Sequence, residues 1–287
     1  MSGTDTQGGM ALAGTTAGSA AKKFGEKAAD RGLNAIVDFV KGKYGEARVK
    51  IGIAFERYLE NAALRYNQIR TLATGTAPRS IIGEDNLYVS IGVSCNGDEV
   101  STESVDPLLR ISKNILILGT GGVGKSMLMR YLFLDTARYE GYVPVLIELR
   151  RIKQQPSGRI SILDLIYDCM RDFDVELPEE QFEYSLRLGK YLFLLDGFDE
   201  VKSSLAKDTA AAIQAFSAKY PNNSYIVTSR PRAETTPLET FVVMESMPLN
   251  KGQAVDLASR IWEEDEKTRE FCRQLDAELY EKHKDFA

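Results

Sequence analysis

A short apolar segment that runs directly into a glycine-rich turn constrains this chain most. The sequence from Ile115 to Ser126 reads ILILGTGGVGKS, and from Gly119 onward it matches the pattern G-x-x-x-x-G-K-[ST]. The glycines lack side chains, so the backbone can curl and turn its N–H groups inward around an anion. A helix that begins near Gly124 would point the positive end of its dipole at the same place. The segment therefore predicts a strand, a phosphate-binding loop and a helix, in that order.

Two side chains at the end of this loop complete its chemistry. Lys125 adds a positive charge that can reach the β- and γ-phosphates of a nucleotide, and Ser126 offers a hydroxyl to Mg²⁺. A glycine-rich loop that matches by chance is the alternative, but the strand before it and the helix after it are the context that the motif requires. The predicted nucleotide-binding residues of the loop are Gly119, Thr120, Gly121, Gly122, Val123, Gly124, Lys125 and Ser126.

Composition excludes several other classes of protein. The net charge of −5 provides no basic surface for general nucleic-acid binding. Cys95, Cys169 and Cys272 are far apart and the only histidine is His283, which argues against a zinc site or a histidine-based triad. No apolar run approaches the roughly 20 residues that span a bilayer, and the N-terminus does not resemble a secretory signal. We therefore expect a cytoplasmic protein whose nucleotide-binding domain has no clear nucleic-acid or membrane partner.

The N-terminal part of the chain carries no catalytic constellation. Residues 1–21 are rich in Gly, Ala, Ser and Thr and predict a flexible tail, although small residues at this spacing also suit close helix packing in a membrane. Residues 22–79 form a helical N-terminal region that ends in a linker, with two amphipathic helices separated near Gly42–Gly45. Two interpretations stay open: the helices are an effector, or they form a hairpin that packs on the rest of the protein.

From Ser80 onward, short apolar segments alternate with helical patterns. Such alternation indicates an α/β fold, here the parallel five-stranded sheet of a P-loop NTPase covered by helices on both faces and preceded by the small helical region. Residues 96–106 are polar and are predicted to be a loop. The predicted strands are a half-buried one at 87–93 and buried ones at 115–118, 143–149, 191–195, 224–228 and 241–244. The predicted helices are one from the loop through about 138 and others at 161–170, 178–188, 205–220, 253–262 and 268–284.

Polar clusters follow the ends of three predicted strands, at 119–126, 196–200 and 229–232. Because ligands of parallel sheets bind at the carboxyl ends of the strands, we expect these clusters to form one site. Asp196 ends an apolar strand and is predicted to hold Mg²⁺ opposite Ser126. Glu200 is the first candidate for the base that orients the attacking water, and Asp199 is the second. The alternative is that the acidic cluster only caps the following helix.

Arg230 is predicted to contact the γ-phosphate, because a planar, permanently charged guanidinium suits phosphate oxygens. A surface arginine before a proline is the alternative, and Arg151 and Arg232 receive no role. The segment Asn250–Gln253 begins like the guanine-reading pattern N-K-x-D but ends in glutamine, which we interpret as a chance match. We therefore expect ATP or ADP with Mg²⁺ rather than a guanine nucleotide.

Four segments in this order resemble a NACHT domain, which belongs to the STAND branch of P-loop NTPases. These segments are GTGGVGKS, YVPVLIELR, YLFLLDGFDEV and YIVTSRPR. The resemblance covers about 80–287 and is strongest over 115–232. It implies a NACHT P-loop NTPase domain at 80–250 and the start of a helical domain at 251–287.

The resemblance also implies a function. NACHT proteins are slow ATPases that act as switches: they rest with ADP bound, exchange nucleotide when a protein trigger binds, and form homo-oligomers that bring their N-terminal effectors together. Animal relatives act in innate immunity and bacterial relatives in antiphage defence. The N-terminus is more similar to the compact N-terminal regions of bacterial or fungal members than to the death-fold domains of animals, and we favour the bacterial antiphage type. We interpret the chain as C-terminally truncated, either a fragment of a longer protein or a member without its own sensor, because the adenine-contacting proline and the winged-helix histidine of the family cannot be placed. Two alternatives are an AAA+-like ATPase motor and a truncated NACHT adaptor or inhibitor of a full-length relative.

Overall fold

The computed structural model describes residues 32–46, 49–69, 79–83, 86–138, 141–154, 158–231 and 238–262, together with 266, 269–270 and 273. The predicted tail at 1–21, most of the linker, Arg232 and most of the last predicted helix lie outside the described residues. Within the described part of the chain, no helix combines the length and the apolar character needed to cross a membrane.

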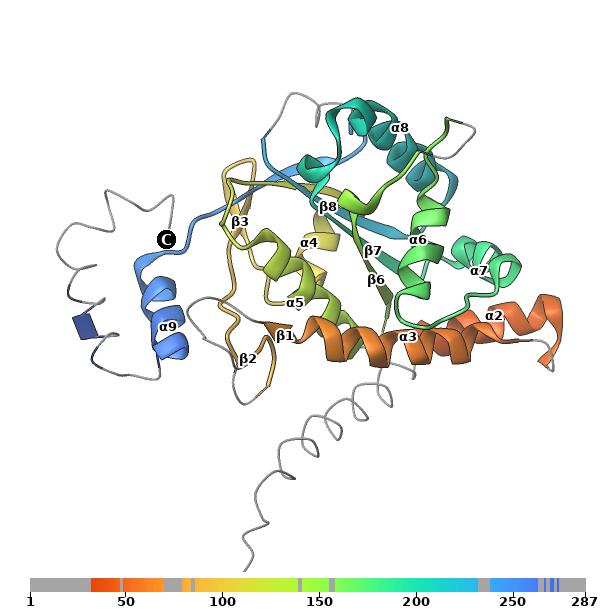
Figure 1. Ribbon diagram of the computed structural model, residues 1–287, viewed down its shortest axis with the longest axis horizontal. Helices are drawn as coiled ribbons and strands as arrows, with labels where there is room; N and C mark the ends of the chain where they lie inside the picture. Colours follow the sequence, from red (N-terminus) through yellow and green to blue (C-terminus); the bar gives the residue numbers. More distant parts are fainter. Residues whose placement is uncertain are drawn as a thin grey trace, which may run out of the picture.

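A seven-stranded sheet forms the centre of the molecule (Figure 1), with the order β4-β3-β9-β5-β8-β7-β6. The strands from β9 to β6 are parallel neighbours, which confirms the five predicted parallel strands. Their bounds are β5 Asn114–Leu118, β6 Val143–Glu148, β7 Tyr191–Asp196, β8 Ser224–Ser229 and β9 Val242–Ser246. Because β5 lies between β8 and β9, the glycine-rich loop leaves the sheet beside the ends of both.

The antiparallel end of the sheet differs from the prediction. Strand β3 covers only Val93–Cys95, so the alternating residues before it are not strand, and β4 occupies Asp98–Val100 inside the predicted loop. The two strands form a hairpin in which Cys95 pairs with Asp98. Its turn is Asn96-Gly97, with φ of 53° and 92°. Asn-Gly is the strongest short hairpin signal, because both central residues of this tight turn adopt positive φ.

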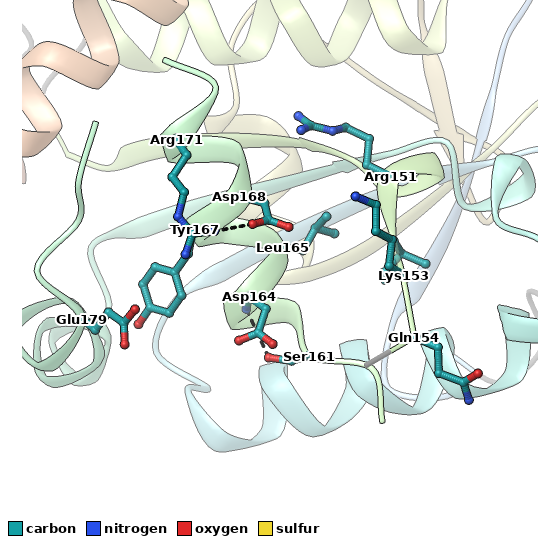
Figure 2. A pocket seen from close by; sticks show the side chains of 11 residues that line it. Arg151, Lys153, Gln154, Ser161, Asp164, Leu165, Tyr167, Asp168, Arg171 and Glu179 are labelled. Atoms are coloured by element: carbon teal, nitrogen blue, oxygen red, sulfur yellow. Dashed lines mark hydrogen bonds and ion pairs between the residues drawn. The ribbon is translucent and has the colours of Figure 1, made fainter. Parts of the chain in front are cut away.

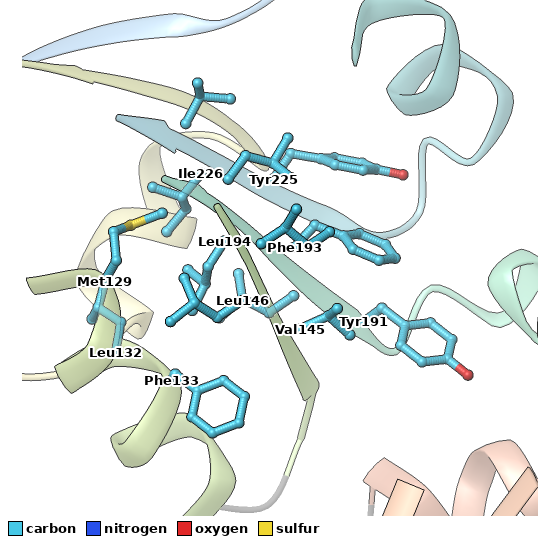
Figure 3. Close-up of a cluster of buried hydrophobic side chains, with 14 of the residues drawn as sticks. Met129, Leu132, Phe133, Val145, Leu146, Tyr191, Phe193, Leu194, Tyr225 and Ile226 are labelled. Carbon is cyan, nitrogen blue, oxygen red and sulfur yellow. The ribbon is translucent and has the colours of Figure 1, made fainter. Parts of the chain in front are cut away.

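Side-chain alternation along the parallel strands makes the sheet apolar on both faces. Figure 3 shows Leu146, Leu194 and Ile226 directed toward helix α5 (Lys125–Arg138), whereas Phe193 and Tyr225 project from the opposite face. All of these strand residues are buried. On the second face, the ring of Phe216 from α8 (Ser203–Lys219) meets Phe193 and Tyr225 edge-on, with centroid distances of 5.3 and 5.9 Å. The sheet is thus covered on both faces, as predicted.

The remaining helices lie around this core. The longer ones are α2 Asn34–Tyr44, α3 Ile51–Tyr66, α6 Ile162–Arg171 and α9 Lys251–Trp262, and the shorter ones are α4 Asp106–Ile111 and α7 Glu179–Ser185. The 3-10 turns are η3 Leu149–Arg151, η4 Leu186–Leu188 and η5 Phe198–Glu200. A small antiparallel pair, β1 Gln68–Ile69 and β2 Arg79–Ser80, follows α3.

Helix α3 packs on the sheet domain through tyrosines. Tyr58 and Tyr66 meet the ring of Phe133 in α5 edge-on, with centroid distances of 6.0 and 5.0 Å. Tyr58 also accepts a hydrogen bond from the backbone N–H of Leu146 at 3.2 Å, and Tyr66 donates to the carbonyl of the same residue at 3.4 Å. Leu146 lies in β6, whose outer edge has no neighbouring strand among the described residues. The helix therefore satisfies polar groups of an edge strand and packs on the sheet domain.

Candidate functional site

The glycine-rich loop has the backbone shape that its sequence predicts. Gly122 and Gly124 have φ of 85° and 94°, in the region that residues with side chains rarely adopt. Gly119 is confined for a different reason, because a Cβ atom there would lie 1.8 Å from the Oγ of Ser246 in β9. The loop is also joined to β8, since the N–H of Gly119 donates to the carbonyl of Ser229 at 3.1 Å. The loop is thus held between the ends of two neighbouring strands and leads into α5.

Lys125 lies across this loop. Its ammonium donates to the carbonyls of Gly119 and Thr120 at 2.6 and 2.7 Å. Burial lowers the pKa of Lys125 below its ordinary value, and the positive charge of Arg230 acts in the same direction, whereas the carboxylates of Asp199 and Asp196 oppose the shift. Lys125 is therefore close enough to charged residues of both other predicted clusters for their charges to affect its pKa.

Asp196 is held at the end of β7 by a neighbouring strand. Thr228 in β8 donates its hydroxyl to Oδ1 of Asp196 at 2.6 Å and accepts the N–H of Gly197 at 3.0 Å. The carboxylate is thereby fixed in orientation while its second oxygen is not used by Thr228. Sequence reasoning missed Thr228, although a buried hydroxyl within the apolar segment YIVTS was an available signal.

Asp199 and Arg230 form a close pair between β7 and β8. One carboxylate oxygen of Asp199 accepts the backbone N–H of Arg230 at 3.0 Å, and the other lies 3.1 Å from its Nε. The Asp199 side chain is only 8% exposed, whereas that of Arg230 is 58% exposed. The guanidinium also lies against the loop, because a Cβ at Gly121 would be 3.1 Å from its Cζ. Arg230 therefore bridges the second cluster and the glycine-rich loop.

Glu200 turns its carboxylate back toward the sheet edge. A Cβ at Gly197, whose φ is 77°, would lie 3.3 Å from the carboxyl carbon of Glu200. Oε2 of Glu200 lies 4.0 Å from Nη1 of Arg150, which follows β6. Arg150 in turn donates from Nε and Nη2 to Oε2 of Glu148 at 3.1 and 2.7 Å. This hydrogen bonding is the main cause that raises the pKa of Arg150 above its ordinary value. Sequence reasoning missed Glu148 and Arg150, although Glu148 lies near the end of a predicted parallel strand and Arg150 directly follows it.

The neighbouring Arg151 belongs to a different surface. It forms an ion pair with Asp172 and lines a cavity of about 380 Å³ beside α6 (Figure 2). Lys153 and Arg171 contribute further positive charge there, but Arg171 is paired with Asp168 at 2.5 Å. The loop residues, Asp196, Asp199, Glu200 and Arg230 lie at the sheet edge described above, whereas Arg151 does not join them.

The segment that resembles the guanine-reading pattern has a structural role. The backbone N–H of Gln253 donates to Oδ1 of Asn250 at 2.9 Å, and the N–H of Asn250 donates to Oε1 of Gln253 at 2.7 Å. This reciprocal pair is a capping box at the start of α9. Gln253 also donates to the carbonyl of Ser90 at 2.9 Å, which joins α9 to the segment before β3.

A known protein family matches the part of the chain that carries this site. The NACHT domain family matches residues 113–265. No curated protein matches the chain. Among solved structures, the Thermotoga maritima RuvB Holliday junction branch migration motor is similar over 53% of this chain, with 12% sequence identity and a TM-score of 0.31. That similarity spans 44% of the motor's own chain.

Proposed function

This chain belongs to the NACHT domain family, and from this membership we propose that it is an ATP-binding switch that hydrolyses ATP slowly and oligomerises to signal in innate immune defence of the antiphage type. The observation that carries the proposal is the position of Arg230, which is anchored on Asp199 and lies against the loop at Gly121. A guanidinium in this place can report whether a γ-phosphate is present. The family supports nucleotide binding. The assembly, the protein trigger, the immune role and the cytoplasmic location belong to the proposal.

The residues present fit a magnesium nucleotide. Ser126 in the first turn of α5 and Asp196 at the end of β7 provide the hard oxygen donors that Mg²⁺ prefers. The described residues contain no group of three or more His, Cys, Asp or Glu side chains suited to a metal ion. That is consistent with an ion which keeps several waters and binds mainly to phosphate. When bound, Mg²⁺ would neutralise charge on the phosphate oxygens.

Within the acidic cluster, we assign the role of base to Glu200 and that of anchor to Asp199. Both oxygens of Asp199 are used by Arg230, whereas the Glu200 side chain is 49% exposed at the same edge. A group that orients water must reach that water directly. Glu200 is better placed for this than a buried carboxylate that already forms an ion pair.

A time course of hydrolysis tests the proposal. The purified protein should contain bound ADP, and loading it with ATP should give few turnovers, because a switch retains its product. Mass measured by light scattering should rise with ATP and Mg²⁺ but not with ADP. Continuous turnover without retained ADP would support the motor alternative, and absence of both nucleotide binding and assembly would contradict the proposal.

Arg230→Gln is expected to weaken the binding of ATP relative to that of ADP. Charge-assisted hydrogen bonds to phosphate contribute about 1.5–3 kcal/mol. The affinity for ATP should therefore fall by about tenfold or more, while the affinity for ADP changes little. Titration calorimetry with both nucleotides measures this difference.

A second variant is needed because Arg230 is paired with the buried carboxylate of Asp199. Removing Arg230 alone leaves Asp199 buried without its partner, which can destabilise the fold. The double variant Asp199→Asn/Arg230→Gln should restore stability and keep the loss of ATP preference. Equal ATP preference in the wild type and the double variant would show that Arg230 does not read the γ-phosphate.

A further inference from the structure

The end of strand β6 contributes to the same sheet edge as the acidic cluster. Glu148, the last residue of β6, is the register partner of Asp196, the last residue of β7. Arg150 follows two residues later in the turn η3, near the turn η5 that contains Glu200. Two charged residues outside the predicted site are therefore placed beside the proposed base.

Arg150 lies between two carboxylates at this edge and contacts both of them. Two nitrogens of Arg150, Nε and Nη2, are occupied by the same oxygen of Glu148, at 3.1 and 2.7 Å. The third nitrogen, Nη1, lies 4.0 Å from Oε2 of Glu200, within ion-pair distance. The carboxyl carbon of Glu200 also lies close to Gly197, where a Cβ would come within 3.3 Å of it. The carboxylate is therefore near both a glycine and a guanidinium.

The turn directs adjacent arginines to different places. In a 3-10 turn, successive side chains project about 120° apart. Arg150 consequently faces the acidic cluster, whereas Arg151 faces α6 and pairs with Asp172. Arg151 therefore cannot substitute for Arg150, although it is the same type of residue and adjacent in sequence.

We propose that Glu148 and Arg150 form a positioning pair that orients the carboxylate of Glu200 for its work on the attacking water. Glu148 fixes the guanidinium, and Arg150 restrains Glu200 at the sheet edge. This inference rests on the proposed function, because it assigns a role relative to the proposed base. Neither residue is a catalytic residue, since both act through Glu200.

Exposure distinguishes this role from a structural one. The side chains of Arg150, Glu148 and Glu200 are 60%, 36% and 49% exposed. Ion pairs of this exposure stabilise a folded protein only weakly. Removing Arg150 should therefore leave the melting temperature almost unchanged. A small displacement of a reacting group, by contrast, can slow a reaction strongly.

The test compares Arg150→Gln with the wild type in single-turnover ATP hydrolysis at saturating Mg²⁺ and ATP. The expected result is a loss of rate of about tenfold, with the dissociation constant for ATP changed by less than about twofold. Arg150→Lys should recover part of the rate, because it keeps the charge without the fork. Glu148→Ala should act in the same direction, and the double variant should lose no more than Arg150→Gln does.

A second readout does not depend on activity. In the nucleotide-free protein, the Nε–H group of Arg150 should give a distinct arginine signal in a ¹H–¹⁵N spectrum, assigned by its absence in Arg150→Gln. Glu148→Ala should shift this signal, because its acceptor is removed. An unchanged signal would contradict the Glu148–Arg150 bond.

Arg171→Gln is the matched control. It removes another exposed arginine from an ion pair, with Asp168, outside the proposed site, and it should leave the rate unchanged. A wild-type rate for Arg150→Gln would overturn the positioning pair and leave the proposed switch intact. A large rise in the dissociation constant would instead show that Arg150 contacts nucleotide. A wild type without ATP hydrolysis would overturn the proposed function, and the positioning role would fall with it.

Discussion

Lys125→Ala is expected to weaken binding of ATP and ADP by about 100-fold or more, which corresponds to about 2.7 kcal/mol. The ammonium of Lys125 lies at the loop, where it donates to the carbonyls of Gly119 and Thr120 at 2.6 and 2.7 Å. It is partly buried, and burial makes a charge–phosphate interaction stronger than it is in water. Titration calorimetry with each nucleotide in the presence of Mg²⁺ measures the effect.

Lys113→Ala is the control for this variant. Lys113 precedes β5, so it lies at the opposite end of that strand from the loop, and it donates to the carbonyl of Asn222 at 3.0 Å. The Lys113→Ala substitution removes the same charge as Lys125→Ala and should leave nucleotide affinity unchanged. If Lys125→Ala binds ATP as tightly as the wild type does, the loop is not the phosphate site.

Glu200→Gln is expected to slow hydrolysis by about 10²- to 10³-fold while ATP still binds. The substitution keeps the size of the side chain but removes the negative charge that orients water. Because ATP would then persist, the variant should also remain longer in the ATP-bound state. Single-turnover hydrolysis and nucleotide affinity, measured on the same preparation, separate the two effects.

Asp199→Asn is the informative comparison, because the two carboxylates are given different roles. It should reduce ATP affinity by loosening Arg230 and change the rate less than Glu200→Gln does. Glu176→Gln, which removes an exposed carboxylate away from this edge, should behave as the wild type. A larger loss of rate in Asp199→Asn than in Glu200→Gln would exchange the two assignments.

Parts of the fold were predictable because they depend on local pattern. Apolar runs such as YLFLL predict buried strands, and these predicted strands correspond to β7 and its parallel neighbours in the structure. The antiparallel hairpin was missed because its strands are short and polar: β4 reads DEV, with only Val100 buried. Its one local signal was the Asn-Gly turn. Pairing between such strands depends on neighbours that the sequence does not reveal.

The candidate site shows the same division. The rule that parallel strands end at one edge predicts that the three clusters meet, and the contacts of Arg230 with Asp199 agree with it. Thr228 and the pair Glu148–Arg150 were not predicted. Thr228 depends on β7 and β8 being neighbours, and Arg150 depends on the direction in which η3 turns.

The sequence by itself determined the α/β alternation, the phosphate loop and the carboxylate at the end of a buried strand, because each depends on residues that are adjacent along the chain. Only the tertiary structure decided which side chains meet. The strand order places β5 between β8 and β9, which brings Arg230 against Gly121 and Ser246 against Gly119. The three-residue turn η3 then directs the adjacent side chains of Arg150 and Arg151 to different surfaces. These contacts join residues that are distant in sequence, and they depend on how strands pair and how turns orient side chains.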